Sequence, residues 1–328
     1  MKLLIVVHHR LALWNVPAWF GDRLAQDFPQ LEVVLRNSYE GIEEHLRDAE
    51  VIFTLSLRPE QLAVARRLRW IHTPTAAVHQ FMFPELIHSD IVLTNSREVH
   101  GPVVAEHVMA LIFVLAKRIP QAVAFQQKHV WGQESMWTQG THLQELSGST
   151  LGLIGVGSIG SRVAHMASAM GMRVIAVREH IEKGTPEAVD AVFPLSDLDT
   201  LLKQSDFVVL AAPLIEATQR LINASRLAAM KATAYLINVG RGPQVDEAAL
   251  ADALRAHRIA GAALDVFERE PLPADSPLWS LENLLITPHT AGLTDKLWYR
   301  HYDLFSDILR RYLAGQPLHF VVDKHKGY

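Results

Sequence analysis

The chain has 328 residues, with 31 lysines and arginines against 35 aspartates and glutamates and a formal net charge of −4. It contains no cysteine, which excludes disulfide bonds, thiolate metal sites and a cysteine nucleophile, and its charge balance excludes the basic footprint of a nucleic-acid-binding protein. The length and the 49% content of hydrophobic residues predict about two globular domains. No apolar run reaches the roughly 18 residues of a membrane span, and the N-terminal run is too short for a signal peptide. We therefore expect a cytoplasmic protein without a membrane span.

Over the first hundred residues, short apolar runs alternate with segments of helical spacing. Near-continuous apolar runs are typical of strands in a parallel sheet that is covered on both faces. The predicted strands are residues 3–7, 31–35, 51–55, 70–72 and 91–94. This region is therefore predicted to form a first α/β unit.

A long apolar helix is predicted from Pro102 to Lys117. Proline suits the first turn of a helix, and apolar residues follow it at helical spacing. The polar stretch over residues 130–149, which contains Trp131 and Trp137, is predicted to be a long loop or an arm packed on a neighbour.

A second and more regular alternation begins at Leu151. Its predicted strands are residues 151–155, 173–177, 207–211, 234–239, 259–264 and 284–287. An amphipathic helix over residues 297–313 ends at Gly315, with Pro317 beyond it, which is a typical helix stop signal. The sequence therefore predicts two α/β units with parallel sheets, and the last helix could cover either of them.

The first turn of the second alternation is rich in glycine. Gly155, Gly157 and Gly160 fit the pattern G-x-G-x-x-G between a predicted strand and a predicted helix, which is the unit that binds the pyrophosphate of a dinucleotide. The three glycines permit a tight turn, close approach of the backbone to the phosphates, and close packing of helix on strand. The N–H groups at the helix start, where Ser158 and Ile159 lie, favour the phosphate charge. We therefore predict a Rossmann domain that binds NAD or NADP.

The residue after the second strand of this unit indicates which dinucleotide is bound. NAD-binding domains carry an Asp or Glu there, which accepts a hydrogen bond from the ribose 2′-hydroxyl. This chain has Arg178, whose guanidinium could bind a 2′-phosphate, and Glu179 follows it. We predict a preference for NADP(H), with NAD(H) possible through Glu179. Pro213, after a later strand, is also assigned to the cofactor site.

Polar residues with catalytic potential follow three later strands. They are Arg241, which lies between two glycines, Asp265 with Glu270, and His289. Because ligands of open parallel sheets bind at the carboxyl ends of the strands, we expect these side chains near the cofactor. A guanidinium can bind a substrate carboxylate, and an imidazole can deliver a proton to a carbonyl oxygen as hydride reaches the carbon. This set predicts reduction of a 2-keto acid.

The other histidines show no metal-ligand spacing, and we expect no metal site. Most of these six residues, His8, His9, His72, His88, His100 and His107, are predicted to be surface residues or residues with local hydrogen bonds.

The chain resembles the D-isomer-specific 2-hydroxyacid dehydrogenases, which include glyoxylate/hydroxypyruvate reductases and phosphoglycerate dehydrogenases. The resemblance covers nearly the whole chain and rests on the glycine-rich turn, on LINVGRGPQVDE from Leu236, on GAALDVFEREPLP from Gly261, and on TPHTAG from Thr287. It implies that His289 is the acid/base, that Glu270 is its partner, and that Arg241 anchors the substrate. It also implies that Asp265 lies near the nicotinamide carboxamide.

The resemblance further implies a domain organisation. Residues 1–98 and 293–328 would form a split, flavodoxin-like substrate domain, residues 99–292 an inserted Rossmann domain, and the cofactor domains would mediate a homodimer. One stretch departs from the family: its substrate loop usually reads near Ala/Gly-Gly-Val-Asp and offers backbone N–H groups to the carboxylate. Here the stretch is Thr75-Ala76-Ala77-Val78-His79, so the backbone donors remain, but the glycine is absent and His79 replaces the acid. Arg58 is either a surface residue or a contact to a distal carboxylate or phosphate.

We therefore expect an NADP(H)-dependent oxidoreductase that acts on a small 2-keto or D-2-hydroxy acid, such as glyoxylate or hydroxypyruvate. A dehydrogenase of another small anion, such as formate or phosphite, would keep the same fold and stays an alternative. A cofactor-sensing interaction protein is a second alternative. The arginine, glutamate and histidine argue against it, because binding alone requires no proton donor. The particular acid and the physiological direction stay open.

Overall fold

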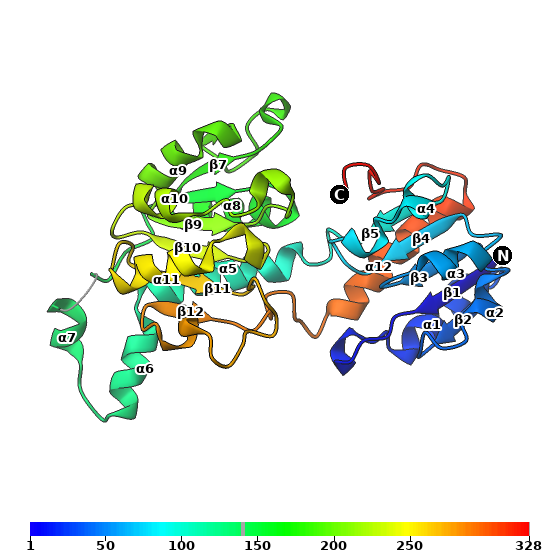
Figure 1. Cartoon of the computed structure of the whole chain (residues 1–328), viewed down its shortest axis with the longest axis horizontal. Helices are drawn as coiled ribbons and strands as arrows, with labels where there is room; N and C mark the ends of the chain where they lie inside the picture. The colour runs from blue at the N-terminus through cyan, green and yellow to red at the C-terminus, as the bar shows by residue number, and fades with distance from the viewer. Residues whose placement is uncertain (139–141, 328) are drawn as a thin grey trace. The chain divides into compact units, whose positions relative to one another are not determined.

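The computed structural model describes residues 1–138 and 142–327. The chain divides into two compact units, one formed by Met1–His100 with Thr294–Tyr328 and the other by Gly101–Leu293. Each unit is an α/β sandwich built on its own parallel sheet (Figure 1). The predicted fold class, with a Rossmann unit inserted into a flavodoxin-like unit, is confirmed.

The first unit contains a five-stranded parallel sheet with the order β2-β1-β3-β4-β5, which is the flavodoxin-like order. The strands lie within one or two residues of the predicted apolar runs. They are β1 (Lys2–Val6), β2 (Glu32–Arg36), β3 (Val51–Thr54), β4 (Trp70–Thr73) and β5 (Val92–Asn95).

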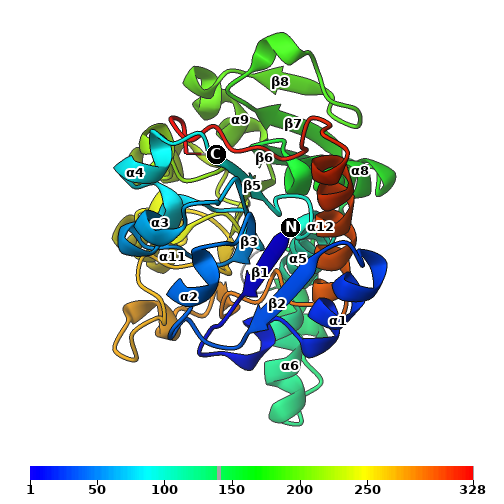
Figure 2. The same ribbon diagram turned by 90° about the vertical axis from the view of Figure 1, so that its right-hand side faces the viewer.

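Helices cover both faces of this sheet (Figure 2). On one face, α1 (Ala18–Asp27) and α12 (Leu297–Leu313) form an apolar core in which Phe20 and Phe305 are fully buried. The other face is covered by the short helices α2 (Glu43–Leu46), α3 (Pro59–Val64) and α4 (Pro84–Ile87). The last helix thus belongs to the first unit, and its boundaries are those predicted.

The second unit contains a seven-stranded parallel sheet with the order β12-β11-β10-β9-β6-β7-β8. The chain turns from one half of the sheet to the other beside β6, and a crevice at such a switch point is where open α/β sheets bind ligands. The short edge strand β8 was not predicted. The strands are β6 (Thr150–Ile154), β7 (Arg173–Val177), β8 (Ala191–Phe193), β9 (Phe207–Leu210), β10 (Tyr235–Asn238), β11 (Gly261–Leu264) and β12 (Leu284–Ile286).

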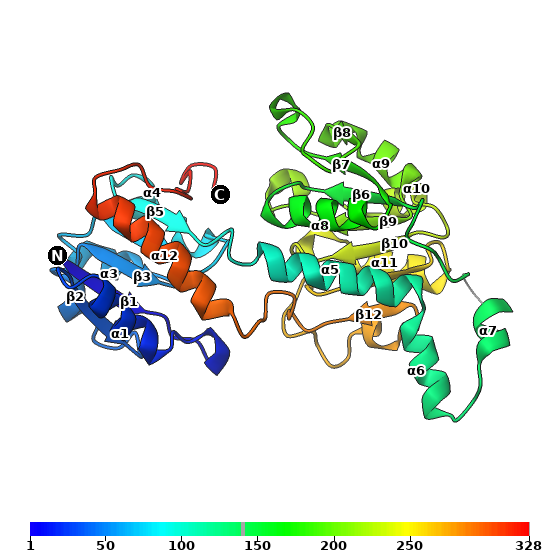
Figure 3. The ribbon, with the colours of Figure 1, turned by 180° about the vertical axis from the view of Figure 1, so that it is seen from behind.

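Two apolar cores lie on opposite faces of this second sheet. Alternate residues of its strands enter each core, as in β9, where Phe207 and Val209 face one core and Val208 and Leu210 face the other. One core packs against α5 (Gly101–Ala116) and α8 (Ser158–Ala169), which Figure 3 shows side by side. The other packs against α9 (Leu198–Gln204), α10 (Ala224–Ala229) and α11 (Glu247–Arg255).

An arm follows α5. It consists of α6 (Ile119–Gln127) and α7 (Gln133–Thr138), which extend beyond the sheet of the second unit (Figure 3). The prediction of a loop over residues 130–149 is wrong for α7, because its six mostly polar residues show no apolar period from which a helix could be recognised. Residues 139–141 of that prediction lie outside the described residues.

No single helix in the described part of the chain has the length and apolarity of a membrane span. Helices α5 and α6 meet that test of length and composition only together, across a bend of 61°.

Candidate active site

The glycine-rich turn joins β6 to α8. Gly155 has φ +96°, a conformation that residues with a Cβ rarely adopt, and a Cβ on Gly160 would collide with the carbonyl oxygen of Gly155. By contrast, a Cβ on Gly157 would meet no described atom within 4 Å. Packing within the protein therefore does not require a glycine at position 157. Its missing side chain leaves open space at the start of α8, the twelve-residue helix that begins with Ser158 and Ile159. Open space at a helix start, where the helix dipole favours negative charge, fits the pyrophosphate of a dinucleotide.

Arg178 directly follows β7, on the neighbouring strand. Its backbone N–H donates to the carbonyl oxygen of Phe193, and its Nη1 donates to the carbonyl oxygen of Gly184 at 3.3 Å. Within the described residues this is the guanidinium's one hydrogen bond, so most of its donors stay available to a ligand. Glu179 is exposed beside it.

Pro213 lies in the loop after β9. Its carbonyl oxygen accepts hydrogen bonds from Thr218 Oγ1 and Gln244 Nε2. Gln244 Oε1 also accepts a hydrogen bond from the backbone N–H of Arg241, which links this loop to the turn after β10.

Arg241 lies in a tight turn after β10 that is held from several sides. Its N–H donates to Gln244 Oε1 at 2.8 Å, and its carbonyl oxygen accepts from Asn238 Nδ2 at 3.1 Å. The following residue, Gly242, packs so closely on the backbone of Phe267 that any side chain would collide with it. The turn is therefore fixed against the loop that carries Glu270.

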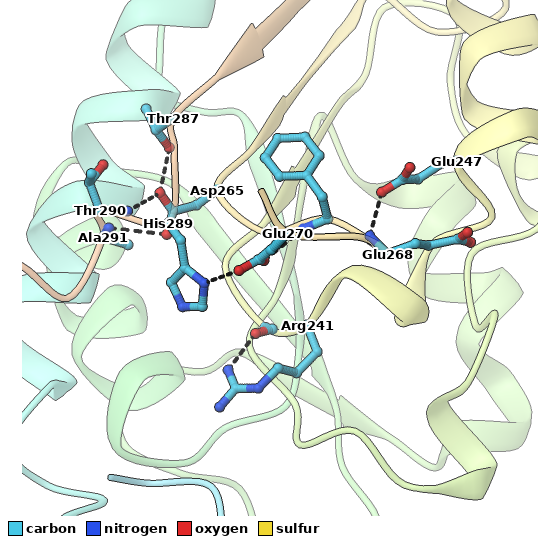
Figure 4. Close-up of polar contacts among 11 residues, drawn as sticks. Arg241, Glu247, Asp265, Glu268, Glu270, Thr287, His289, Thr290 and Ala291 are labelled. Carbon is cyan, nitrogen blue, oxygen red and sulfur yellow. Dashed lines mark hydrogen bonds and ion pairs between the residues drawn. The ribbon is translucent and has the colours of Figure 1, made fainter. Parts of the chain in front are cut away.

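The guanidinium of Arg241 makes one hydrogen bond within the described residues, from Nη1 to the carbonyl oxygen of Gly240 at 2.7 Å. Burial lowers the pKa of Arg241, and the nearby Glu270 carboxylate opposes that shift. The side chain stays a cation with donors to spare, which suits the binding of a carboxylate (Figure 4).

His289 and Glu270 form a close pair (Figure 4). Nδ1 of His289 lies 2.6 Å from Oε2 of Glu270, and Oε1 of the same carboxylate accepts the N–H of Phe267 at 3.0 Å. The side chain of His289 is 51% exposed, and its Nε2 has no hydrogen-bond partner among the described residues. The pair thus has the form of an oriented imidazole with one nitrogen held and the other open to a ligand.

Asp265 organises the turn that carries His289. This carboxylate is 1% exposed and accepts hydrogen bonds from Thr287 Oγ1 at 2.6 Å, from the N–H of Thr290 at 2.8 Å and from the N–H of Ala291 at 3.0 Å. Its backbone oxygen also accepts the N–H of His289, whose φ is +54°. Asp265 therefore bonds the backbone of His289 and of the two residues that follow it. These bonds support the left-handed backbone conformation of His289, which costs free energy in a residue other than glycine.

Two residues of this site were not predicted. Thr287 bonds Asp265, and His107 on α5 lies with its Nε2 3.2 Å from Thr287 Oγ1 and 3.7 Å from Asp265 Oδ1. His107 had been predicted to be a surface or locally bonded residue, which is wrong because its partner lies 180 residues further along the chain. Burial lowers the pKa of His107, against the opposing effect of Asp265.

Glu247 supports the loop that precedes Glu270. Its Oε1 accepts the N–H of Glu268 at 2.6 Å, and burial raises the pKa of Glu247. No sequence pattern indicated this contact between α11 and the loop after β11.

The predicted substrate loop lies in the first unit. Ala76, Ala77 and Val78 follow β4 and precede a single 3-10 turn at His79–Phe81. Arg58 lies before α3, where its N–H donates to Gln61 Oε1. Among the described residues, no group of three or more histidine, aspartate or glutamate side chains could hold a metal ion.

The fold and this site define a class. A parallel sheet with a glycine-rich dinucleotide turn, and an arginine and a histidine–glutamate pair at the ends of its strands, is the structure of a nicotinamide-dinucleotide-dependent oxidoreductase. A sequence profile for the D-isomer specific 2-hydroxyacid dehydrogenase, NAD binding domain, matches residues 109–291. The chain belongs to this family of NAD(P)-dependent oxidoreductases.

Individual relatives agree with this assignment. A glyoxylate reductase of Thermofilum pendens is 35% identical over 301 residues, which cover 90% of this chain and 85% of the relative. A D-3-phosphoglycerate dehydrogenase of Methanocaldococcus jannaschii is 31% identical over 304 residues, which cover 92% of this chain but only 57% of that relative. The solved structure of an NADPH-dependent glyoxylate/hydroxypyruvate reductase from Sinorhizobium meliloti, in complex with NADP and sulfate, matches with a TM-score of 0.83 at 26% identity and covers 100% of both chains.

Proposed function

We propose that this protein is an NADP(H)-preferring reductase of small 2-keto acids such as glyoxylate or hydroxypyruvate, with the D-2-hydroxy acid as product. The observation that carries the proposal is the His289–Glu270 pair, held at 2.6 Å. Nε2 of the imidazole has no partner among the described residues, and an arginine with available donors lies in the same unit. A protein that only binds a dinucleotide needs neither group.

Each catalytic residue has a role that its contacts support. Arg241 binds the substrate carboxylate through its free N–H donors and polarises the adjacent carbonyl. His289 delivers a proton from Nε2 to the carbonyl oxygen, and Glu270 orients the ring and stabilises its charged form. When bound, the dihydronicotinamide supplies the hydride that reaches the carbonyl carbon. Asp265 fixes the turn of His289 and lies at the nicotinamide end of the cofactor site.

The remaining cofactor contacts are assigned to the glycine-rich turn, namely Gly155, Gly157, Ser158, Ile159 and Gly160, with Pro213 at the neighbouring strand end. The preference for NADP(H) rests on Arg178, whose guanidinium bonds only Gly184 among the described residues and can receive a 2′-phosphate. The NADP in the S. meliloti reductase, a protein similar to this chain, supports that choice. NAD(H) stays possible through Glu179.

The first unit, residues 1–98 with 293–328, is proposed as the substrate domain. The N–H groups of Ala76, Ala77 and Val78 would bind a carboxylate oxygen of the substrate. Residues 99–292 would form the cofactor domain.

A cytoplasmic homodimer formed through the cofactor units is also proposed. Its support is the apolar surface of the arm, where Trp131 is 88% and Trp137 is 64% exposed, together with exposed Ile119 and Val123. Sedimentation analysis of the full chain tests this, since a monomer would contradict it.

A panel of keto acids assayed with NADPH and with NADH tests the proposed activity. We expect oxidation of NADPH with glyoxylate, hydroxypyruvate or a related acid. NADPH bound tightly without turnover of any acid would favour the cofactor-sensing alternative. Reduction of NADP⁺ by formate or phosphite would favour a dehydrogenase of that anion.

A further inference from the structure

The substrate loop lacks the glycine that its family usually has, yet it shows no sign of strain. The positive-φ non-glycine residues of the described chain all lie elsewhere, and Val78 has φ −128° and ψ 10°. Alanine therefore fits at both 76 and 77, and the conformation of this loop has to be set by something other than glycine.

The loop has an unequal distribution of hydrogen bonds. All four carbonyl oxygens from Thr75 to Val78 accept hydrogen bonds from within the unit. The N–H of Ser96 donates to Thr75 O, Asn95 Nδ2 to Ala76 O, Thr75 Oγ1 to Ala77 O, and the N–H of Phe81 to Val78 O. The N–H groups of Ala76, Ala77 and Val78 have no partner among the described residues. Successive N–H groups without internal partners, next to carbonyl oxygens that are already hydrogen-bonded, form the kind of backbone site that binds anions.

Side chains hold two of those carbonyls. Asn95, which is 2% exposed, donates from Nδ2 to Ala76 O at 2.8 Å. Thr75 donates from Oγ1 to Ala77 O at 2.6 Å. Gln80 Nε2 bonds Leu55 O at 3.0 Å and Thr75 Oγ1 at 3.3 Å, which ties the loop to the end of β3.

The amide side chains of Asn95 and Gln80 make these contacts at a cost in folding stability. Asn95 Oδ1 and Gln80 Oε1 are both buried without a hydrogen-bond partner in the described part of the chain. A buried acceptor without a donor lowers stability, and such groups in native proteins call for an explanation. Turning either amide over would set an amide oxygen against a carbonyl oxygen, that of Ala76 for Asn95 and that of Leu55 for Gln80.

We propose that Thr75, Asn95 and Gln80 are positioning residues that form a side-chain clamp on the loop and keep its three N–H groups free for a substrate carboxylate. The clamp takes the place of the missing glycine. This inference rests on the proposed function, because it specifies how residues 76–78 of that site are held.

The test compares Thr75→Val, which removes the hydroxyl at equal size, with Thr75→Ser, which keeps it. For each full-length enzyme we would measure KM and kcat for glyoxylate, the inhibition constant of oxalate with NADPH saturating, and the Kd of NADPH. For Thr75→Val we expect KM and the oxalate constant to rise roughly tenfold, because the lost hydroxyl no longer orders the binding loop through its hydrogen bonds to Ala77 O and Gln80 Nε2. The kcat and the NADPH Kd should change by less than about threefold, and Thr75→Ser should stay near wild type.

Gln80→Met is a second variant in case Thr75→Val does not fold, and it should show the same rise in KM. Tyr312→Phe is the matched control, since it removes one hydrogen bond, to Glu50 at 3.0 Å, at the amino end of β3 in the same sheet. Equal KM and oxalate constants in Thr75→Val and Thr75→Ser, or a loss in kcat alone, would overturn the clamp.

The same experiment separates this inference from the proposed function. A wild-type enzyme that reduces no keto acid refutes the activity, and oxalate binding to its NADPH complex still tests the clamp. If that complex binds no oxalate, the anion site itself is refuted.

Discussion

Nδ1 of His289 and Oε2 of Glu270 lie 2.6 Å apart, although the two residues come from the ends of different strands and are 19 positions apart in the chain. Neither side chain is held by this contact alone. The other carboxylate oxygen of Glu270 accepts the N–H of Phe267, and the backbone of His289 is fixed on Asp265. The pair is therefore oriented before any ligand binds, as general acid catalysis requires.

Glu270→Gln tests that orientation. The amide keeps the shape of the side chain but no longer stabilises a charged imidazole, so kcat should fall roughly tenfold to a hundredfold. Glu268→Gln is the matched control, because its exposed side chain lies in the same loop and should leave kcat unchanged. Steady-state kinetics with glyoxylate check both variants, and equal rates for the two would remove Glu270 from the mechanism.

Arg178→Asp tests the choice of cofactor. The guanidinium should bind a 2′-phosphate, whereas a carboxylate at this position repels that phosphate and accepts from a ribose hydroxyl. The ratio of kcat/KM for NADPH over NADH should therefore fall by roughly a hundredfold, about the effect of losing a charge-assisted bond and adding a repulsive one. Arg173→Asp, at the other end of β7, is the control and should keep the wild-type ratio.

The pattern of strands explains how much of the fold and of the active site could be predicted from the sequence. Continuous apolar runs such as residues 173–177 are distinct enough to define strands, and parallel strands bring their carboxyl ends to one side of the sheet. The placement of Arg241, Glu270 and His289 at strand ends could therefore be predicted. Short elements such as α7 and β8 could not, since six or three residues contain no measurable period.

Contacts between distant residues were also beyond sequence reasoning. His107 lies on a helix whose apolar stripe explains its neighbours, and nothing near it in the chain points to Thr287. The clamp of Thr75, Asn95 and Gln80 has the same character, because its hydrogen bonds depend on the ends of three different strands.

Gly157→Ala should separate cofactor binding from stability. A Cβ there meets no described atom within 4 Å, so the midpoint of thermal unfolding should be unchanged or slightly raised. A methyl group would nevertheless occupy the space proposed for the pyrophosphate, and the Kd of NADPH should rise roughly tenfold or more.

Gly242→Ala is the contrasting variant. Its Cβ would collide with the backbone of Phe267, so thermal unfolding should occur at a lower temperature. Fluorescence titration with NADPH and differential scanning calorimetry measure both effects. Loss of stability in Gly157→Ala with unchanged NADPH affinity would contradict the assignment of that glycine.

Two buried histidines predict acid sensitivity of the fold. His72 is fully buried, and burial lowers its pKa from 6.5 to about 3; burial also lowers the pKa of His301 well below its usual range. Between pH 6.5 and about 3 the unfolded chain takes up protons that the folded chain does not, so stability falls as the pH falls. The slope should be roughly 1 kcal/mol per pH unit for each such histidine.

Urea unfolding at pH 7.5 and at pH 5.0 measures this effect. The midpoint should be lower at pH 5.0, and His72→Gln should reduce the difference, whereas His88→Gln, at an exposed histidine, should not. A midpoint that is the same at both pH values would contradict the buried neutral state of His72.

His289 is proposed as the proton donor in the reduction of a 2-keto acid. Its most direct test is the kcat of NADPH oxidation with glyoxylate or hydroxypyruvate in His289→Asn, with the Kd of NADPH measured alongside. We predict a kcat lower by roughly a hundredfold or more, the usual contribution of a general acid, and an unchanged Kd. A kcat equal to that of the wild type would show that His289 is not the proton donor.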